Sequence, residues 1–201
     1  MNRIIYEDNH LIAVTKRSGE IVQGDKTGDK PLSEEIKSYL KTKNELNVFN
    51  RKFFEKIKLR YIVLCEGLKV GEINALGFAN SEMKTILLNI NTNDDDFERV
   101  IHHEVFHIIE NNYKKFFPDT VWAKFNNPNF YYSGSLKNPE AYSLAKLSNT
   151  NGFFSEYAKY SISEDMAETF SFINSREKYV SEKINLDKIL NKKVIFIKEG
   201  M

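Results

Sequence analysis

The chain has little cysteine, no excess charge of either sign and no long apolar run, and each lack excludes a class of protein. Its 201 residues include a single cysteine, Cys65, so no disulfide can form within the chain and the fold does not depend on an oxidising compartment. Cys65 lies in the apolar run YIVLC, which favours a small buried side chain over a reactive thiol. The formal net charge is +1 and its lysines and acids are interspersed, so no basic face indicates nucleic acid.

No apolar run reaches the roughly 18 residues that a membrane span needs. The N-terminus, MNRIIYEDNHLIAV, has a short apolar stretch before a charge and no small-residue cleavage site, unlike a secretory signal. Apolar residues make up 41% and charged residues 28%, as in a globular protein that folds alone. We therefore expect a soluble, cytoplasmic chain without a membrane or nucleic-acid partner, although a protein exported by another route would look the same.

The spacing of apolar residues along the chain predicts two parts with different patterns. Residues 3–22 alternate as in a β-hairpin with an Asp-Asn turn, and a loop then leads into a helix from about Leu32 to Lys41. The charged stretch KTKNELN follows and is the best boundary candidate. We therefore predict an N-terminal hairpin–helix extension over residues 1–45 and a second domain over residues 46–201.

The second part mixes strand and helix patterns. A helix is expected over Phe53–Lys58, a buried strand at RYIVLCEG and another strand at KTILLNIN, with a Gly-rich segment between the two strands. The acidic cluster at residues 94–96 predicts an N-cap for a helix from about Asp95 to Asn112. Beyond it we expect a long loop or irregular lobe, two helices and a closing strand, at residues 118–139, 139–147, 163–179 and 192–199.

Three of the four histidines lie within the stretch RVIHHEVFHIIEN, residues 99–111. On a helix His103 and His107 project from one face and can reach one ion, while Glu104 lies beside it and can act as a base on metal-bound water. This His-Glu-x-x-His arrangement is the zincin motif and predicts one catalytic Zn²⁺. The alternative is a set of histidines that serve packing alone.

A catalytic zinc needs a third protein ligand. His102 points about 100° away from His103, and His10 is remote in the hairpin, so we expect a carboxylate instead. In EYAKYSISEDMAETF, Glu164 is the candidate ligand, and Glu168, one turn later, could accept the outer N–H of a ligand histidine. Ser161-x-x-Glu164 is also a capping box, which is the competing interpretation.

Together, HEVFH and Y-x6-EDMAE resemble the catalytic domain of anthrax lethal factor and the clostridial Pro-Pro endopeptidases, a gluzincin-like group. The resemblance covers roughly residues 60–175. It implies that Tyr157, seven residues before the ligand glutamate, lies in the active site, and that Glu168 matches the group's second glutamate. It also implies a zinc metallopeptidase in which Glu104 is the general base and Tyr157 stabilises the oxyanion. A tyrosine near a cleft more often serves packing than catalysis, and Tyr160 is the competing candidate, so Tyr157 is favoured through the resemblance alone.

Zincins commonly bind substrate along an edge strand, and KTILLNIN precedes the active-site helix, so we expect it to bind the peptide, with an interior position as the alternative. Separately, IIYEDNHLIAVTKRSGEIVQGDKTGDK resembles the opening hairpin of RluA-type pseudouridine synthases. The chain has no Arg-Leu-Asp sequence, so their catalytic aspartate motif is missing and uridine isomerisation is not supported.

These patterns predict an α+β, zincin-like fold, in which a small mixed sheet packs on the HExxH helix and a cleft separates it from a second helical lobe. The predicted function is a zinc-dependent endopeptidase, a hydrolase acting on a peptide or protein substrate. A catalytically silent metal- or peptide-binding module and a remnant of an RNA pseudouridine synthase fusion are the alternatives.

Overall fold

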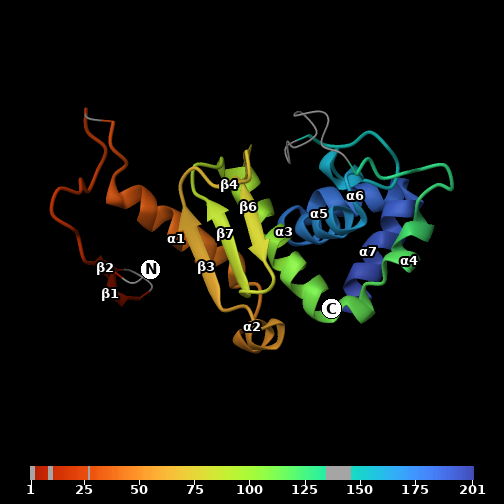
Figure 1. Cartoon of the computed structure of the whole chain (residues 1–201), viewed down its shortest axis with the longest axis horizontal. Helices are drawn as coiled ribbons and strands as arrows, with labels where there is room; N and C mark the ends of the chain where they lie inside the picture. The colour runs from red at the N-terminus through yellow and green to blue at the C-terminus, as the bar shows by residue number, and fades with distance from the viewer. Residues whose placement is uncertain (1–2, 9–10, 27, 135–145) are drawn as a thin grey trace. The chain divides into compact units, whose positions relative to one another are not determined.

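The computed structural model describes residues 3–8, 11–26, 28–134 and 146–201 (Figure 1). The chain divides into two compact units, Met1–Val48 and Phe49–Met201. None of the helices in the described ranges combines the length and the apolar character that crossing a membrane requires.

The first unit is a hairpin followed by a helix. Strands β1 (Ile4–Glu7) and β2 (Ile12–Val14) pair antiparallel, as the alternation predicts, and α1 spans Leu32–Leu46. Glu7 accepts hydrogen bonds from the Tyr39 hydroxyl (3.0 Å) and the Lys43 ammonium (2.8 Å), which ties the hairpin to α1. The stretch KTKNELN, expected to mark a boundary, continues α1 to Leu46, and the first unit ends just after it at Val48. The division into domains at residues 45 and 46 stays a prediction.

The second unit contains a three-stranded sheet in the order β3-β7-β6 (Figure 1). Strands β3 (Tyr61–Cys65) and β7 (Thr85–Asn89) are parallel, and β6 (Gly77–Asn80) pairs antiparallel with β7. A separate antiparallel pair is formed by β4 (Lys69–Val70) and β5 (Ile73–Asn74).

Two strand predictions are corrected by this order. KTILLNIN forms β7, which lies inside the sheet with Ile86 and Leu88 fully buried, so it is not the edge strand. One edge is β6, which comes from the Gly-rich segment that showed no strand pattern. The other edge is β3, which is largely exposed rather than buried, with Tyr61 at 63%.

Helix α3 (Asp94–Tyr113) lies between the sheet and the C-terminal helices (Figure 1). Earlier in this unit, α2 spans Arg51–Ile57. Helix α3 begins where the side chain of Asn93 accepts a hydrogen bond from the backbone N–H of Asp96, so its N-cap is Asn93 rather than an aspartate. One side of α3 packs on β6 and β7, and another side packs on α5 (Ile162–Ser175). Its apolar residues are buried from both directions, which holds the histidine motif inside the unit.

The remaining described chain is mostly helical. Its elements are η1 (Lys114–Phe116), α4 (Asp119–Trp122), η2 (Ala123–Phe125), η4 (Tyr157–Lys159), α6 (Glu177–Leu186) and α7 (Lys188–Gly200). The stretch predicted as a loop from Pro118 thus includes short helical turns. The helix predicted over residues 139–147 lies almost wholly outside the described residues.

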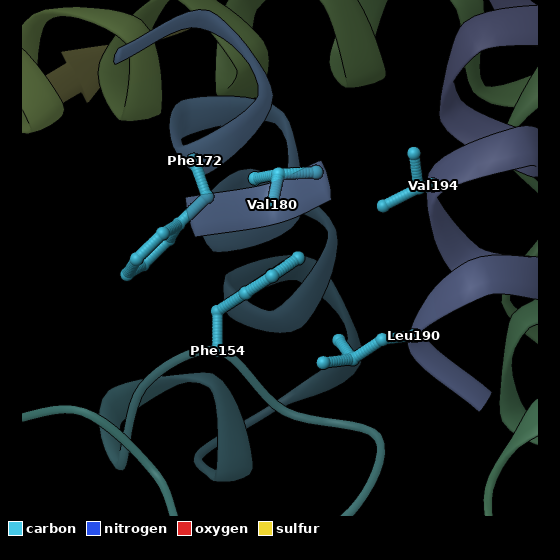
Figure 2. Packing of buried hydrophobic residues seen from close by; sticks show 5 residues of the cluster. All are labelled: Phe154, Phe172, Val180, Leu190 and Val194. Carbon is cyan, nitrogen blue, oxygen red and sulfur yellow. The ribbon is translucent and has the colours of Figure 1, made fainter. Parts of the chain in front are cut away.

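The closing strand predicted at KKVIFIKE is wrong, because these residues belong to α7. The Asp187 side chain caps this helix by accepting from the backbone N–H groups of Ile189 and Leu190. Leu190 and Val194, one helical turn apart, are buried against Phe154, Phe172 and Val180 (Figure 2). This helical spacing outweighs the strand propensity of the short apolar run.

Candidate metal centre

Two imidazoles converge on one face of α3. His103 and His107 lie one turn apart, and their Nε2 atoms are 3.0 Å from each other. The ring of His103 is buried and that of His107 is partly buried. His102, by contrast, faces the rings of Phe49 and Phe170, at centroid distances of 5.8 and 6.5 Å, and burial lowers its pKa to about 4.

Glu164, in the first turn of α5, brings a carboxylate to the same point. Its Oε2 lies 2.8 Å from Nε2 of His103 and 3.5 Å from Nε2 of His107. The turn is set by Ser161, whose hydroxyl accepts from the backbone N–H of Glu164 at 3.2 Å, so the serine N-cap and the candidate ligand coexist. Histidine, histidine and glutamate therefore form a group that can hold a metal ion.

The geometry of these three atoms suits zinc. Ligand atoms held tetrahedrally about 2.0–2.1 Å from one ion lie about 3.3 Å apart, close to the three observed separations. Oε2 of Glu164 is buried, and its neighbours at 2.8 and 3.5 Å are the two Nε2 atoms, so all three atoms face one point where an ion would lie. Two imidazole nitrogens and one carboxylate oxygen are also a donor set that zinc accepts, with a fourth position left for water.

The outer nitrogen of His103 is held by Glu168. Its Nδ1 lies 2.9 Å from Oε1 of this fully buried glutamate, and because an ionised carboxylate only accepts, Nδ1 carries the proton. The Arg99 guanidinium and the Ser155 hydroxyl both donate to the other oxygen, Oε2. Nε2 of His103 is thereby left as the atom available to a metal.

His107 has a corresponding arrangement that the sequence reasoning missed. Its Nδ1 lies 3.3 Å from the Ser163 hydroxyl, which in turn donates to Glu110. Glu110 follows His107 by three residues on α3, a helical spacing that could have indicated it. With a proton on each Nδ1, both Nε2 lone pairs face the oxygen of Glu164, and such a cluster needs a cation between its members.

The charges of the site shift its pKa values accordingly. Burial alone would lower the pKa of His103, but Glu164 and Glu168 outweigh it and raise that pKa to about 9. Burial would raise the pKa of Glu164, but His107 and His103 hold it well below its usual range. In the protein without metal, a proton on the histidines therefore takes part of the cation's place.

Glu104 lies beside the ligand atoms, where β6 approaches α3. A Cβ atom on Gly77 would lie 2.6 Å from Oε1 of Glu104 and 2.6 Å from Cγ1 of Val100, so this approach requires glycine. A backbone hydrogen bond from Ala79 also reaches the Glu104 carboxylate, and burial raises its pKa above the usual value. Strand β6 thus limits where the Glu104 carboxylate can lie on α3.

Tyr157, in η4, lies on the other side of His103, with 5.8 Å between the ring centroids. Burial first, and then the charges of Glu164 and Glu104, raise the pKa of its phenol, which keeps it protonated. Tyr160 stacks on Tyr157 at 6.3 Å and does not line the pocket. The structure therefore brings all six candidate residues, Tyr157 included, to one place.

These residues open into a pocket of about 500 Å³. Its walls come from β6, from the face of α3 that carries His103 and His107, from η4 and from the first turn of α5, with one residue each from η1 and α4. They include Gly77, Phe78, Ala79, Ser81, His103, Glu104, His107, Glu110, Asn111, Lys114, Asp119, Tyr157, Ser163 and Glu164. The pocket lies beside α3, and the predicted zincin-like cleft between two lobes stays a prediction.

Comparison with known protein families identifies the kind of protein. A family described as "Putative zinc-binding metallo-peptidase" matches residues 28–199. The chain belongs to this metallopeptidase family. The matched range takes in α3, α5 and every residue that lines the pocket, so the metal group lies within the part that defines the family.

No curated protein and no solved structure matches the chain. Membership of the metallopeptidase family supports zinc binding, hydrolase chemistry and a peptide substrate, and the observed mixture of helices and small sheets fits the expected α+β class. The resemblances to lethal factor and to RluA-type synthases stay predictions, as do the zincin-like details of the fold and the role of each site residue.

Proposed function

We propose that this protein is a zinc-dependent endopeptidase. The observation that carries the proposal is the convergence of Nε2 of His103, Nε2 of His107 and Oε2 of Glu164 beside Glu104. Membership of the metallopeptidase family supports it independently of this geometry.

His103, His107 and Glu164 would hold the metal, and Glu168 would fix the orientation of the His103 ring. When bound, zinc supplies a Lewis acid that lowers the pKa of water in its open position to about 7 and polarises a carbonyl. The buried Arg99 keeps the Glu168 carboxylate in place by donating to its second oxygen. Partners of this kind typically change metal affinity by 10- to 100-fold.

Glu104 is the proposed general base. It directly follows a proposed ligand and lines the same pocket, so it can take a proton from the water that attacks the peptide carbonyl. It can then return that proton to the leaving amine. Burial moves the pKa of Glu104 upward, towards the range in which one carboxylate can do both.

Tyr157 is the proposed donor to the oxyanion. Its phenol stays protonated near neutral pH because burial raises its pKa, and its ring lies beside that of His103 in the pocket. A hydrogen-bond donor aimed at a developing oxyanion is worth about 3 kcal/mol in the transition state.

The substrate strand proposed here is β6, in place of KTILLNIN. In the described part of the chain β6 pairs with β7 alone, and its residues Gly77, Phe78 and Ala79 line the pocket. A peptide laid along the free side of β6 would receive backbone hydrogen bonds, with side-chain pockets giving selectivity. Because β6 also contacts Glu104, such a peptide would lie next to the base.

The test separates zinc binding from turnover. Purified wild type and Glu104→Gln are compared for bound zinc and for cleavage of a peptide library, with Glu98→Gln as the matched control. Glu98 lies on the same helix and pairs with Arg176 at 3.3 Å, away from the pocket. We expect about one zinc in all three proteins, cleavage by wild type and Glu98→Gln, and no detectable cleavage by Glu104→Gln.

Tyr157→Phe extends the same test. We expect zinc to be retained and kcat to fall about 100-fold, because one donor to the oxyanion is lost. Cleavage that survives Glu104→Gln would contradict the proposed base. Zinc bound by wild type without any peptide cleavage would favour the silent binding module instead.

A further inference from the structure

Helix α7 carries a buried lysine that the proposed chemistry does not use. Lys193 is fully buried; its ammonium donates to Oδ2 of Asp165 at 2.6 Å and to the carbonyl of Gly152 at 2.7 Å. The same ammonium lies over the rings of Phe153 and Trp122, 4.0 and 5.3 Å from their centroids. A buried charge is costly unless it is paired, so its partner is the informative residue.

That partner, Asp165, directly follows the proposed ligand Glu164. Its Oδ2 also accepts from Nε1 of Trp122 at 2.8 Å and from the Tyr132 hydroxyl at 2.7 Å. One oxygen thus receives donors from α4, from the segment that follows η2, and from α7. These three donors compensate the buried carboxylate and fix its position.

Neighbouring residues on a helix project about 100° apart around its axis. Holding the side chain of Asp165 therefore helps to set the rotation of the first turn of α5, as the contacts of Glu168 do one turn later, and with it the direction in which Glu164 points. Oε2 of Glu164 lies 2.8 Å from Nε2 of His103 and 3.5 Å from Nε2 of His107, the atoms with which it would share the metal, so the setting of the α5 backbone decides whether the carboxylate reaches them. The Ser161 hydroxyl caps this turn by accepting from the backbone N–H of Glu164, and this contact does not fix the Glu164 carboxylate.

We propose that Lys193 and Asp165 are positioning residues that aim Glu164 at the two histidines, so that α7 completes the metal site without contacting it. This inference rests on the proposed zinc function. It extends the site to a helix that lies outside both sequence motifs. A purely structural ion pair would change the stability of the folded unit and leave its affinity for zinc unchanged.

The decisive variant is Lys193→Met, with Val194→Ala as its matched control. Val194 is the next residue on α7 and packs in the apolar cluster of Phe154, Phe172 and Leu190 instead (Figure 2). Its truncation removes buried methyl groups and destabilises the helix without touching Asp165. The zinc dissociation constant is measured on the full chain by competition with a chelator, at a temperature where both metal-free variants are folded.

We expect zinc to bind Lys193→Met 10- to 100-fold more weakly than wild type, and to bind Val194→Ala within about twofold of wild type. Cobalt(II) serves as a second probe: its visible spectrum should change in Lys193→Met and match wild type in Val194→Ala. If Lys193→Met does not fold, Asp165→Asn combined with Lys193→Met removes both charges and should show the same loss of affinity.

Wild-type zinc affinity and an unchanged cobalt spectrum in the folded Lys193 variant would overturn the inference and leave the proposed peptidase intact. Equal weakening in Lys193→Met and Val194→Ala would also overturn it, because general destabilisation would then explain the loss. A wild-type chain that binds no zinc would instead overturn the proposed function, on which the inference rests.

Discussion

The two walls of the pocket are built by different means. On one side β6 presents backbone, with a glycine where the strand meets Glu104 and a backbone hydrogen bond from Ala79. On the other side α5 presents three acids within five residues, two of them buried and each paired with a buried cation. The β6 wall requires a residue without a side chain where it meets Glu104, whereas the α5 wall requires buried cations that neutralise its acids.

This difference separates the expected effects of mutation. Changes in the α5 wall should alter zinc affinity and folding stability together, because its charges hold the proposed ligands. Changes in the β6 wall should alter turnover while zinc stays bound, because that wall touches the proposed base. Three predictions follow this division, in order of decreasing effect.

The largest effect is expected for Arg99→Met. It leaves the fully buried Glu168 without its cation, so we expect the free energy of unfolding to fall by about 3–5 kcal/mol and zinc affinity to fall 10- to 100-fold. Urea unfolding and chelator competition measure the two quantities. Arg176→Met, which breaks a part-exposed pair with Glu98, is the control and should cost at most about 1 kcal/mol. Equal losses of stability and zinc affinity in Arg99→Met and Arg176→Met would contradict the expected difference between a buried and a part-exposed ion pair.

Gly77→Ala should have a smaller and different effect. The added methyl group would lie 2.6 Å from Oε1 of Glu104, so the base or the strand must shift. We expect kcat/KM to fall by about tenfold or more while the zinc dissociation constant stays the same. Gly24→Ala is the control, since a Cβ there meets no atom within 4 Å. A loss of zinc in Gly77→Ala would show that the strand wall also holds the ligands.

The smallest expected effect is a pH-dependent change in the number of protons released when the protein binds zinc. Without metal, the carboxylates hold the pKa of His103 at about 9, above the usual histidine value of 6.5. A raised pKa in the folded state stabilises the metal-free protein fully below about pH 6.5, and this contribution is lost as the pH rises through 9. Zinc must displace the proton, so its apparent affinity should rise over the same range.

Calorimetric titration with zinc in buffers of different ionisation enthalpy measures this release. We expect His103 to contribute close to one released proton per zinc at pH 7 and close to none above about pH 10. The metal-free protein should meanwhile unfold at lower urea concentration at pH 9.5 than at pH 6.5. Proton release that does not change across this range would contradict the assignment of His103.

How far the sequence predicts this site depends on how far apart its members lie in the chain. His103, Glu104 and His107 share one helix, and Glu164 and Glu168 share another, so helical periodicity alone could group each set. Arg99 and Lys193 could not be found in this way, because their carboxylate partners lie 69 and 28 residues away. Pairings between elements depend on tertiary packing, which a single sequence does not display.

The fold shows the same division. Helix α3 was predictable because its apolar residues and its N-terminal polar residues follow helical rules along the chain. The position of β7 inside the sheet, and of β6 at its edge, depends on which strands meet rather than on their own residues. In α7 the run VIFI favours a strand locally, but its place against the cluster around Phe172 makes it helical.

The contact between Lys193 and Asp165 also affects the order in which the molecule can mature. Synthesis proceeds from the N-terminus, so both histidines and Glu164 leave the ribosome before the lysine that neutralises Asp165. Until α7 emerges, Asp165 has no ammonium beside it, so burying the start of α5 would carry the uncompensated desolvation cost of a carboxylate. A nascent chain would therefore carry every proposed zinc ligand before the ion pair that we infer to position Glu164 can form.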